Sequence, residues 1–328
     1  MRTLLCLLFG TLAVGLLTAQ DSPPSLTGSM ASDMGWVLLR DGNSQGSTPN
    51  WYATSTAQAV LANESQTSRY RIATWMDYHL HENRWSVVLE EAWAEWRPLP
   101  TADLRMGRFR HSQGPCQAFN PTNPFLQRDV FDARVGAMGR DGLKLEWDTP
   151  PVLLAGTVFL PTDQELPVGL ESSGVALTAV LQLPEAGLLG STEAGLTAAR
   201  AGGSKSWVSG GWISIDVDGW VAGAEASWDG AVEIALTVNR TFGEVFAVVE
   251  AQYTARDPAW MGFGRLSWAH EDLEIAATAL TDFHAGATKM GFDVGWNVSD
   301  NLEVNLQGST NWAPEKGTSL GLGARWYL

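Results

Sequence analysis

The chain has 328 residues and a formal net charge of −15, and it contains 16 tryptophans but only 17% charged residues. With 45% hydrophobic residues it is not a typical disordered chain, which needs low hydrophobicity and high charge. The acidic balance argues against a nucleic-acid partner, because such a partner requires a basic face to neutralise phosphates.

Residues 1–19 predict a secretory signal peptide. Arg2 is the positive start, and the apolar run that follows ends in Leu17-Thr18-Ala19 with a small residue. An uncleaved anchor helix is the alternative, but the run is short for a hydrocarbon core of about 30 Å. We expect residues 20–32 to form a loose lead-in on the periplasmic side. Cleavage would leave Cys116 alone, so we expect no internal disulfide.

From residue 33 onwards, apolar and polar residues alternate almost to the end of the chain. Leu302, Val304 and Leu306, for example, alternate with polar residues, and a period of two is that of a β-strand. About eighteen such segments are close to the ~10 residues of a membrane-spanning strand, and sixteen is the open alternative. They are 33–40, 51–61, 69–79, 84–96, 102–110, 139–147, 152–159, 174–182, 187–198, 206–216, 219–227, 231–239, 243–253, 261–269, 272–281, 288–297, 302–311 and 318–328.

The connections between these segments alternate between mostly short and generally longer ones, which is typical of an outer-membrane β-barrel. Lipid offers no hydrogen-bond partners, so a sheet that spans it must close and leave no free edge. We therefore predict an all-β, antiparallel transmembrane barrel over residues 33–328, in which the last strand pairs with the first. A soluble β-sandwich with tryptophans in its core is the alternative.

Tryptophan positions support the barrel, because amphipathic rings gather at the two interfaces of a membrane. One predicted belt lies near the short connections and contains Trp36, Trp96, Trp147, Trp220, Trp268, Trp296 and Trp326. The other contains Trp51, Trp85, Trp207, Trp228, Trp260 and Trp312.

The polar face of the strands would line a lumen wide enough for water. The predicted lumen and constriction residues carried by strands are Arg69, Arg71, Glu91, Arg105, Arg108, Arg110, Glu233, Glu274, Asp293, Glu303 and Arg325. Arg105 differs in parity from Arg108 and Arg110, so a bulge or a rim position is required. The facing of strand 84–96 stays open because Glu90 and Glu91 are adjacent. We expect partial pairing of Glu90, Glu91 or Glu95 with Arg105 or Arg108, and a lumen that mildly favours cations.

Residues 111–138 form the longest connection, and long loops of this kind are usually functional or disordered. Its aromatic residues favour an ordered loop. Folded inward, it would narrow the pore with Phe119, Asn120 and Phe125; folded outward, it would be an external flap. We favour the inward arrangement.

The segment Leu104-Arg105-Met106-Gly107-Arg108-Phe109-Arg110, followed by Gly114 and by Phe119-Asn120-Pro121-Thr122-Asn123-Pro124-Phe125, resembles part of the Gram-negative outer-membrane porin-like β-barrels. Glu91-Ala92-Trp93 resembles that group as well. Asn123 stands where an Asp is common, and the end Trp326-Tyr327-Leu328 departs from the usual terminal aromatic residue. The resemblance implies a channel-type protein of the cell outer membrane and names no solute.

The sequence therefore predicts a porin-like channel for passive diffusion of small hydrophilic solutes, with no enzymatic activity, metal or cofactor. The expected partners are outer-membrane lipid, the outer-membrane assembly machinery and small polar solutes; a homotrimer stays open. A non-conducting structural or adhesive barrel is the second hypothesis. A barrel hydrolase that uses His270, or His284 beside Asp282, is the third.

Overall fold

The computed structural model describes residues 25–40, 48–64, 68–79, 83–111, 114–123, 139–160, 173–184, 189–201, 207–312 and 316–327. Within these ranges the chain forms one antiparallel sheet of eighteen strands. The strands are β1 Ser25–Arg40, β2 Thr48–Glu64, β3 Ser68–His79, β4 Arg84–Leu99, β5 Ala102–Phe109, β6 Arg140–Thr149, β7 Val152–Phe159, β8 Gly174–Leu183, β9 Leu189–Ala201, β10 Val208–Val217, β11 Trp220–Trp228, β12 Val232–Phe242, β13 Val245–Thr254, β14 Ala259–His270, β15 Leu273–Asp282, β16 Ala287–Ser299, β17 Leu302–Trp312 and β18 Lys316–Tyr327.

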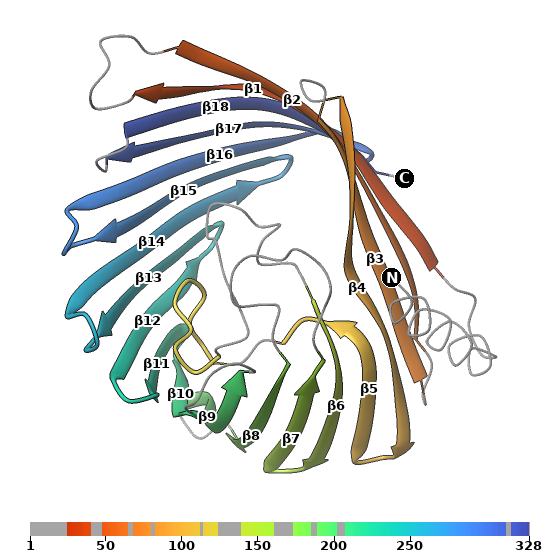
Figure 1. Ribbon diagram of the computed structural model, residues 1–328, viewed down its shortest axis with the longest axis vertical. Helices are drawn as coiled ribbons and strands as arrows, with labels where there is room; N and C mark the ends of the chain where they lie inside the picture. The colour runs from red at the N-terminus through yellow and green to blue at the C-terminus, as the bar shows by residue number, and fades with distance from the viewer. Residues whose placement is uncertain are drawn as a thin grey trace.

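The sheet closes on itself, because β1 pairs with β2 on one side and with β18 on the other. Figure 1 shows the resulting ring of strands around a central space. The predicted pairing of the last strand with the first is confirmed, and a two-layer sandwich is wrong. Closure joins the first and last strands, so that neither forms a free edge of the sheet in lipid.

All eighteen predicted segments coincide with strands, and the main error concerns the first one. β1 begins at Ser25, so most of the predicted lead-in 20–32 belongs to the sheet. Small residues weaken the apolar-polar contrast there, but backbone pairing does not depend on that contrast: Gly28 pairs with Ala59, and Ser29 with Tyr327. The predicted signal peptide, residues 1–19, lies outside the described residues.

Connections on the two rims of the barrel differ in length, as predicted. Asp218-Gly219 joins β10 to β11, and both residues have positive φ (51° and 76°), the conformation of a tight hairpin turn. Ser25 at the start of β1 and Tyr327 at the end of β18 lie at this same rim. The longest connection, after β5, leaves from the opposite rim.

The tryptophans of the predicted belts lie near strand ends, with one correction. Trp36 pairs with Trp51 and lies close to Arg40, where β1 meets the long-loop rim. The predicted place of Trp36 at the short-turn rim is therefore wrong, because β1 begins at Ser25 and not at residue 33.

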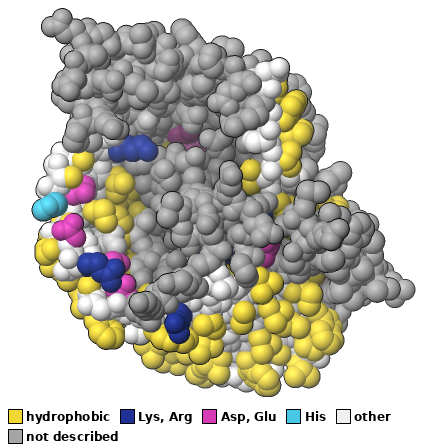
Figure 2. Space-filling view, in the orientation of Figure 1, with side chains coloured by type: hydrophobic (Ala, Val, Ile, Leu, Met, Phe, Trp, Pro, Cys, Tyr) yellow, Lys and Arg dark blue, Asp and Glu magenta, His cyan; other side chains and the backbone are white. Residues whose placement is uncertain are grey.

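Exposed apolar side chains lie on one face of most strands whose side chains the structure describes. In β12, Val232, Ile234, Leu236 and Val238 are exposed, whereas Ala235 between them is fully buried. Figure 2 shows hydrophobic side chains along the outer edge of the barrel, over β6 to β8 at the bottom of the view. A soluble protein rarely exposes so large an apolar surface, so this face is suited to lipid.

Candidate pore constriction

The end of β5 turns away from the barrel wall (Figure 1). β4 and β5 pair only from Ala92–Arg108 to Leu99–Ala102, and beyond that point the Gly139 N–H donates to the Glu90 carbonyl oxygen at 2.8 Å. Gly107 makes this turn possible, because its φ is +115° and a Cβ there would lie 2.1 Å from the Ala92 carbonyl oxygen. The chain is therefore directed into the lumen before the long loop starts.

A β-bulge in β4 settles the facing of its adjacent glutamates. Ala73 pairs with Glu91 and Thr74 with Leu89, so Glu90 is the extra residue of the bulge. Both Glu90 and Glu91 are buried, which a regular strand would not allow. The irregularity required by the parity of the three arginines lies at Gly107 in β5, whose φ is +115°.

The glutamates of β4 form ion pairs with arginines of β3, of β5 and of the residue just after β5. Glu95 pairs with Arg69 and, at 2.6 Å, with Arg105. Glu91 pairs with Arg71 at 2.7 Å, and Glu90 pairs with Arg110. The expected Glu95–Arg105 pair is confirmed.

Arg108 is the exception to the expected pairing. Its guanidinium binds both carboxylate oxygens of Asp141 on β6, at 2.9 and 2.7 Å, and is buried. Asp141 is not among the acidic partners expected for Arg108, and β5 brings this side chain to β6, where the two residues are opposite in register.

These pairs leave a basic surface in the lumen. The side chains of Arg69, Arg71 and Arg110 are 36%, 37% and 42% exposed, whereas those of Glu95, Glu91 and Glu90 are 3%, 11% and 2% exposed. The carboxylates lie against the wall and the guanidinium groups lie in front of them. We call Arg69, Arg71 and Arg110 the arginine face.

The loop after β5 crosses the barrel and reaches the wall formed by β11 to β14, which are not neighbours of β5 in the sheet. In Figure 1 its yellow segment lies inside the ring beside β11 and β12. Glu250 of β13 accepts hydrogen bonds from the backbone N–H groups of Gln117, Ala118 (2.8 Å) and Phe119 (3.1 Å). Segment 114–123 is therefore folded inward, which decides between the two arrangements of this part of the loop.

Glu225 of β11 makes a second attachment. It accepts hydrogen bonds from the Cys116 N–H and from the Thr122 hydroxyl, both at 2.9 Å. Like Glu250, it is only 1% exposed. Buried carboxylates are costly unless hydrogen bonds satisfy them, and here the loop supplies the donors.

Apolar contacts complete the attachment of the loop. Cys116 and Phe119 form a hydrophobic cluster with Ala235, Val248 and Phe263 on the lumen side of β12, β13 and β14. Asn123 then donates through Nδ2 to the His111 carbonyl oxygen at 2.8 Å, which ties the end of the segment to the chain just after β5.

Predicted site residues fall into three groups. Arg69, Arg71, Glu91, Arg105, Arg108 and Arg110 gather around the start of the loop, and Phe119 and Asn120 belong to the inward segment. Glu233, Glu274, Asp293, Glu303 and Arg325 are spread over β12, β15, β16, β17 and β18, where Arg325 is opposite Glu303 in register. Phe125 lies outside the described residues.

Glu225 and Glu250 hold the loop, and neither residue was predicted from the sequence to play this role. Small residues beside them were the available signal. A Cβ on Gly223 would lie 2.6 Å from the Pro115 side chain, so the wall is recessed where the loop docks.

The residues of the hydrolase hypothesis make turn contacts. Asp282 accepts from the backbone N–H groups of His284 and Ala285, both at 2.9 Å. His270 donates to Glu244 in an exposed pair, and this hydrogen bond lowers the pKa of Glu244. In the part of the chain that the structure describes, neither histidine ring forms a hydrogen bond with a hydroxyl or thiol nucleophile.

Membrane-spanning helices and metal clusters are both absent from the described residues. No helix there has the length and apolar character needed to cross a membrane. No group of three or more His, Cys, Asp or Glu side chains there is arranged to hold a metal ion.

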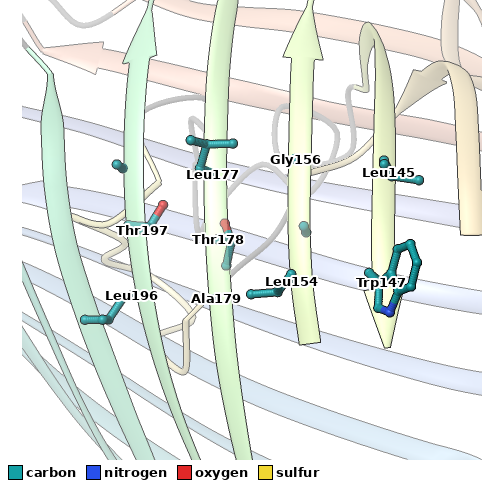
Figure 3. Close-up of a pocket in the computed structure, with 11 residues that line it drawn as sticks. Leu145, Trp147, Leu154, Gly156, Leu177, Thr178, Ala179, Leu196 and Thr197 are labelled. Carbon is teal, nitrogen blue, oxygen red and sulfur yellow. The ribbon is translucent and has the colours of Figure 1, made fainter. Parts of the chain in front are cut away.

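A groove on the outer surface crosses β6 to β9 (Figure 3). Leu154, Leu177 and Leu196 on its sides are exposed, and Gly156, Ala179 and Ala198 also line it. Its lining contains no charged residue, so it is unsuited to a hydrophilic solute and belongs to the apolar outer face.

Comparison with known proteins places the fold. OccK9 (OpdG) of Pseudomonas aeruginosa has a TM-score of 0.62 and 13% identity, with coverage of 94% of this chain and 99% of that one. The outer membrane protein OpdK of P. aeruginosa has a TM-score of 0.61 and 11% identity, covering 93% and 98%. This chain has the fold of a Gram-negative outer-membrane porin-like barrel.

A third similar structure is that of OccK2 (OpdF) of P. aeruginosa in complex with glucuronate, with a TM-score of 0.60, 11% identity and coverage of 93% and 98%. OpdK has also been solved with vanillate. No family model matches the porin-like barrel described here, and no curated protein matches its sequence.

Proposed function

We propose that the protein is an outer-membrane channel through which small hydrophilic solutes diffuse passively. The observation that carries this proposal is the inward loop segment 114–123, held on the far wall by Glu225 and Glu250. A buried and hydrogen-bonded loop has one fixed position, so it sets a constant width for the pore. Selection then follows from width and lumen charge, without covalent chemistry.

The arginine face indicates which solutes the channel favours. The sequence suggested a mild preference for cations, because a count of charges treats buried and exposed carboxylates alike. Glu90, Glu91 and Glu95 are buried behind guanidinium groups, and Glu225 and Glu250 are covered by the loop. Small carboxylates fit this surface, since guanidinium binds them in a bidentate manner. Vanillate and glucuronate, found with the similar structures, are both carboxylates.

Placement in the outer membrane is part of the proposal. It is supported by the exposed apolar outer face, by tryptophans near both strand ends and by the predicted signal peptide at residues 1–19. Lipid and the assembly machinery are then the expected partners. In a homotrimer, the interface between subunits would lie on the same apolar face as the lipid.

A non-conducting barrel is the second candidate. Two hydrophobic clusters lie inside the ring, one around Cys116 and Phe119, and one formed by Phe109, Phe159, Ala176 and Ala199. A lumen closed by such clusters would serve a structural or adhesive role.

Planar-bilayer conductance of the purified protein tests the proposal. We expect stable ion-conducting steps from the wild type and larger steps after deletion of residues 112–128. Unchanged conductance after the deletion would contradict the constriction. A wild type that folds and inserts but never conducts would instead support the closed barrel.

A further inference from the structure

One arginine lies on the outward face of the barrel near the short-turn rim. Arg240 continues the row of exposed apolar residues of β12, two positions after Val238 and two before Phe242. Side chains at this spacing point to the same side of a strand. Arg240 therefore faces out of the barrel, unlike the arginines of the arginine face.

Two aromatic rings flank this side chain. The Arg240 guanidinium carbon lies 4.9 Å from the centre of the Trp220 ring and 5.0 Å from that of Phe242. The two rings meet edge to face at 5.5 Å, and Trp220 is opposite Arg240 in register. These contacts hold the guanidinium in place through its planar face and leave the N–H groups at its edge for another acceptor.

That acceptor is not a protein carboxylate. Among the residues that the structure describes, none forms an ion pair with Arg240. Glu244, in the neighbouring turn, is engaged by His270 and by Trp268 Nε1. Arg97 near the same rim differs from Arg240, because it pairs with the Asp103 carboxylate at 2.6 Å.

We propose that Arg240, with Trp220 and Phe242, binds the phosphate of a glycerophospholipid in the periplasmic leaflet. The guanidinium donates to the phosphate oxygens, while the aromatic rings lie at the level of the headgroup and contact the upper acyl chain. The site rests on the proposed membrane placement but not on conduction. Its role is to fix the depth and rotation of the barrel next to the short-turn rim.

The proposal can be tested by native mass spectrometry of the delipidated, refolded barrel titrated with phosphatidylglycerol. We expect Arg240→Gln to weaken binding about fivefold, in line with the contribution of one basic residue near a membrane surface. Trp220→Leu should weaken it as well, and Arg240→Lys should retain part of the affinity. Arg97→Gln is the matched control, because it removes one positive charge near the same rim, and it should bind like the wild type.

Two further titrations identify the ligand. Diacylglycerol, which lacks the phosphate, should bind weakly to wild type and Arg240→Gln alike, and millimolar inorganic phosphate should not displace the lipid. Equal phosphatidylglycerol affinity of wild type and Arg240→Gln would overturn the proposal, as would displacement by free phosphate. Conductance recorded on the same samples is independent of these results, so a silent channel with an Arg240-dependent lipid site would contradict only the proposed transport.

Discussion

The Glu250 carboxylate on β13 accepts a hydrogen bond from the backbone N–H of Ala118 at 2.8 Å, across 132 residues of sequence and from one wall of the barrel to a loop that starts on another. The same carboxylate also binds the N–H groups of Gln117 and Phe119. Three successive N–H groups that converge on one anion form a concave binding site for negative charge. The loop thus keeps its position because the wall supplies the anion.

Glu250→Gln should release this part of the loop. The amide keeps the size of the side chain but loses the charge, and hydrogen bonds to a charged group contribute about 1.5–3 kcal/mol each. We expect larger and noisier single-channel conductance and faster proteolysis within 111–138, with the barrel still folded. Glu274→Gln is the control, because it removes the charge of an exposed carboxylate on β15. Equal effects of the two substitutions would show that lumen charge, and not loop attachment, determines the conductance.

Gly114→Ala should displace the loop through a steric contact. Gly114 has φ +80°, and an added Cβ would lie 2.3 Å from Oε1 of Glu225. Gly219 has a similar φ of +76° in a turn with nothing near the Cβ position, so Gly219→Ala carries the same backbone strain, of order 1–2 kcal/mol, without the contact. Conductance should change only for Gly114→Ala, and electrophoretic heat-modifiability should show both variants folded. A matching conductance change in Gly219→Ala would argue against the contact.

Strands could be predicted from the sequence because their two faces meet different media. In β12 the alternation of Val232, Ile234 and Leu236 with less apolar residues fixes both the strand and its facing. Where that contrast is weak, as at Ser25–Ser32 in β1, the prediction failed and moved Trp36 to the wrong rim.

The constriction was only partly predictable. Length and aromatic residues indicated an inward loop. Apart from the Thr122 hydroxyl, the partners of Glu225 and Glu250 are backbone N–H groups, which leave no pattern in the sequence because almost every residue carries one. The bulge at Glu90 was equally invisible, since the register between β3 and β4 depends on both strands. The pair Arg108–Asp141 could not be predicted from the sequence either, because it depends on how β5 leaves the barrel wall.

Arg108→Met should strongly destabilise the barrel. Removing one partner leaves the buried Asp141 carboxylate without its bidentate guanidinium, and breaking a buried pair costs about 3–5 kcal/mol. Arg97→Met is the control: its exposed pair with Asp103 should cost less than about 1 kcal/mol. The free energy of unfolding from urea titration in lipid vesicles measures both. The double variant Arg108→Met/Asp141→Leu should recover most of the loss, and a double variant as unstable as the single one would show that packing at residue 108 matters more than charge.

The arginine face should determine the ion selectivity of the pore. Arg71 is 37% exposed in the lumen, and over a screening length of about 10 Å at 0.1 M salt its charge acts on any ion that passes the constriction. Arg71→Gln should therefore shift the reversal potential in a salt gradient towards cations, and Arg110→Gln should do the same. Arg256→Gln is the control, since Arg256 pairs with Asp229 in an exposed contact beyond the end of β13 and should leave the reversal potential unchanged. The size of the shift should fall as the salt concentration rises, because screening shortens the reach of each charge. An unchanged reversal potential, or a shift towards anions, in Arg71→Gln would show that the Arg71 charge does not attract anions in the pore, and the proposed preference for carboxylates would then be wrong.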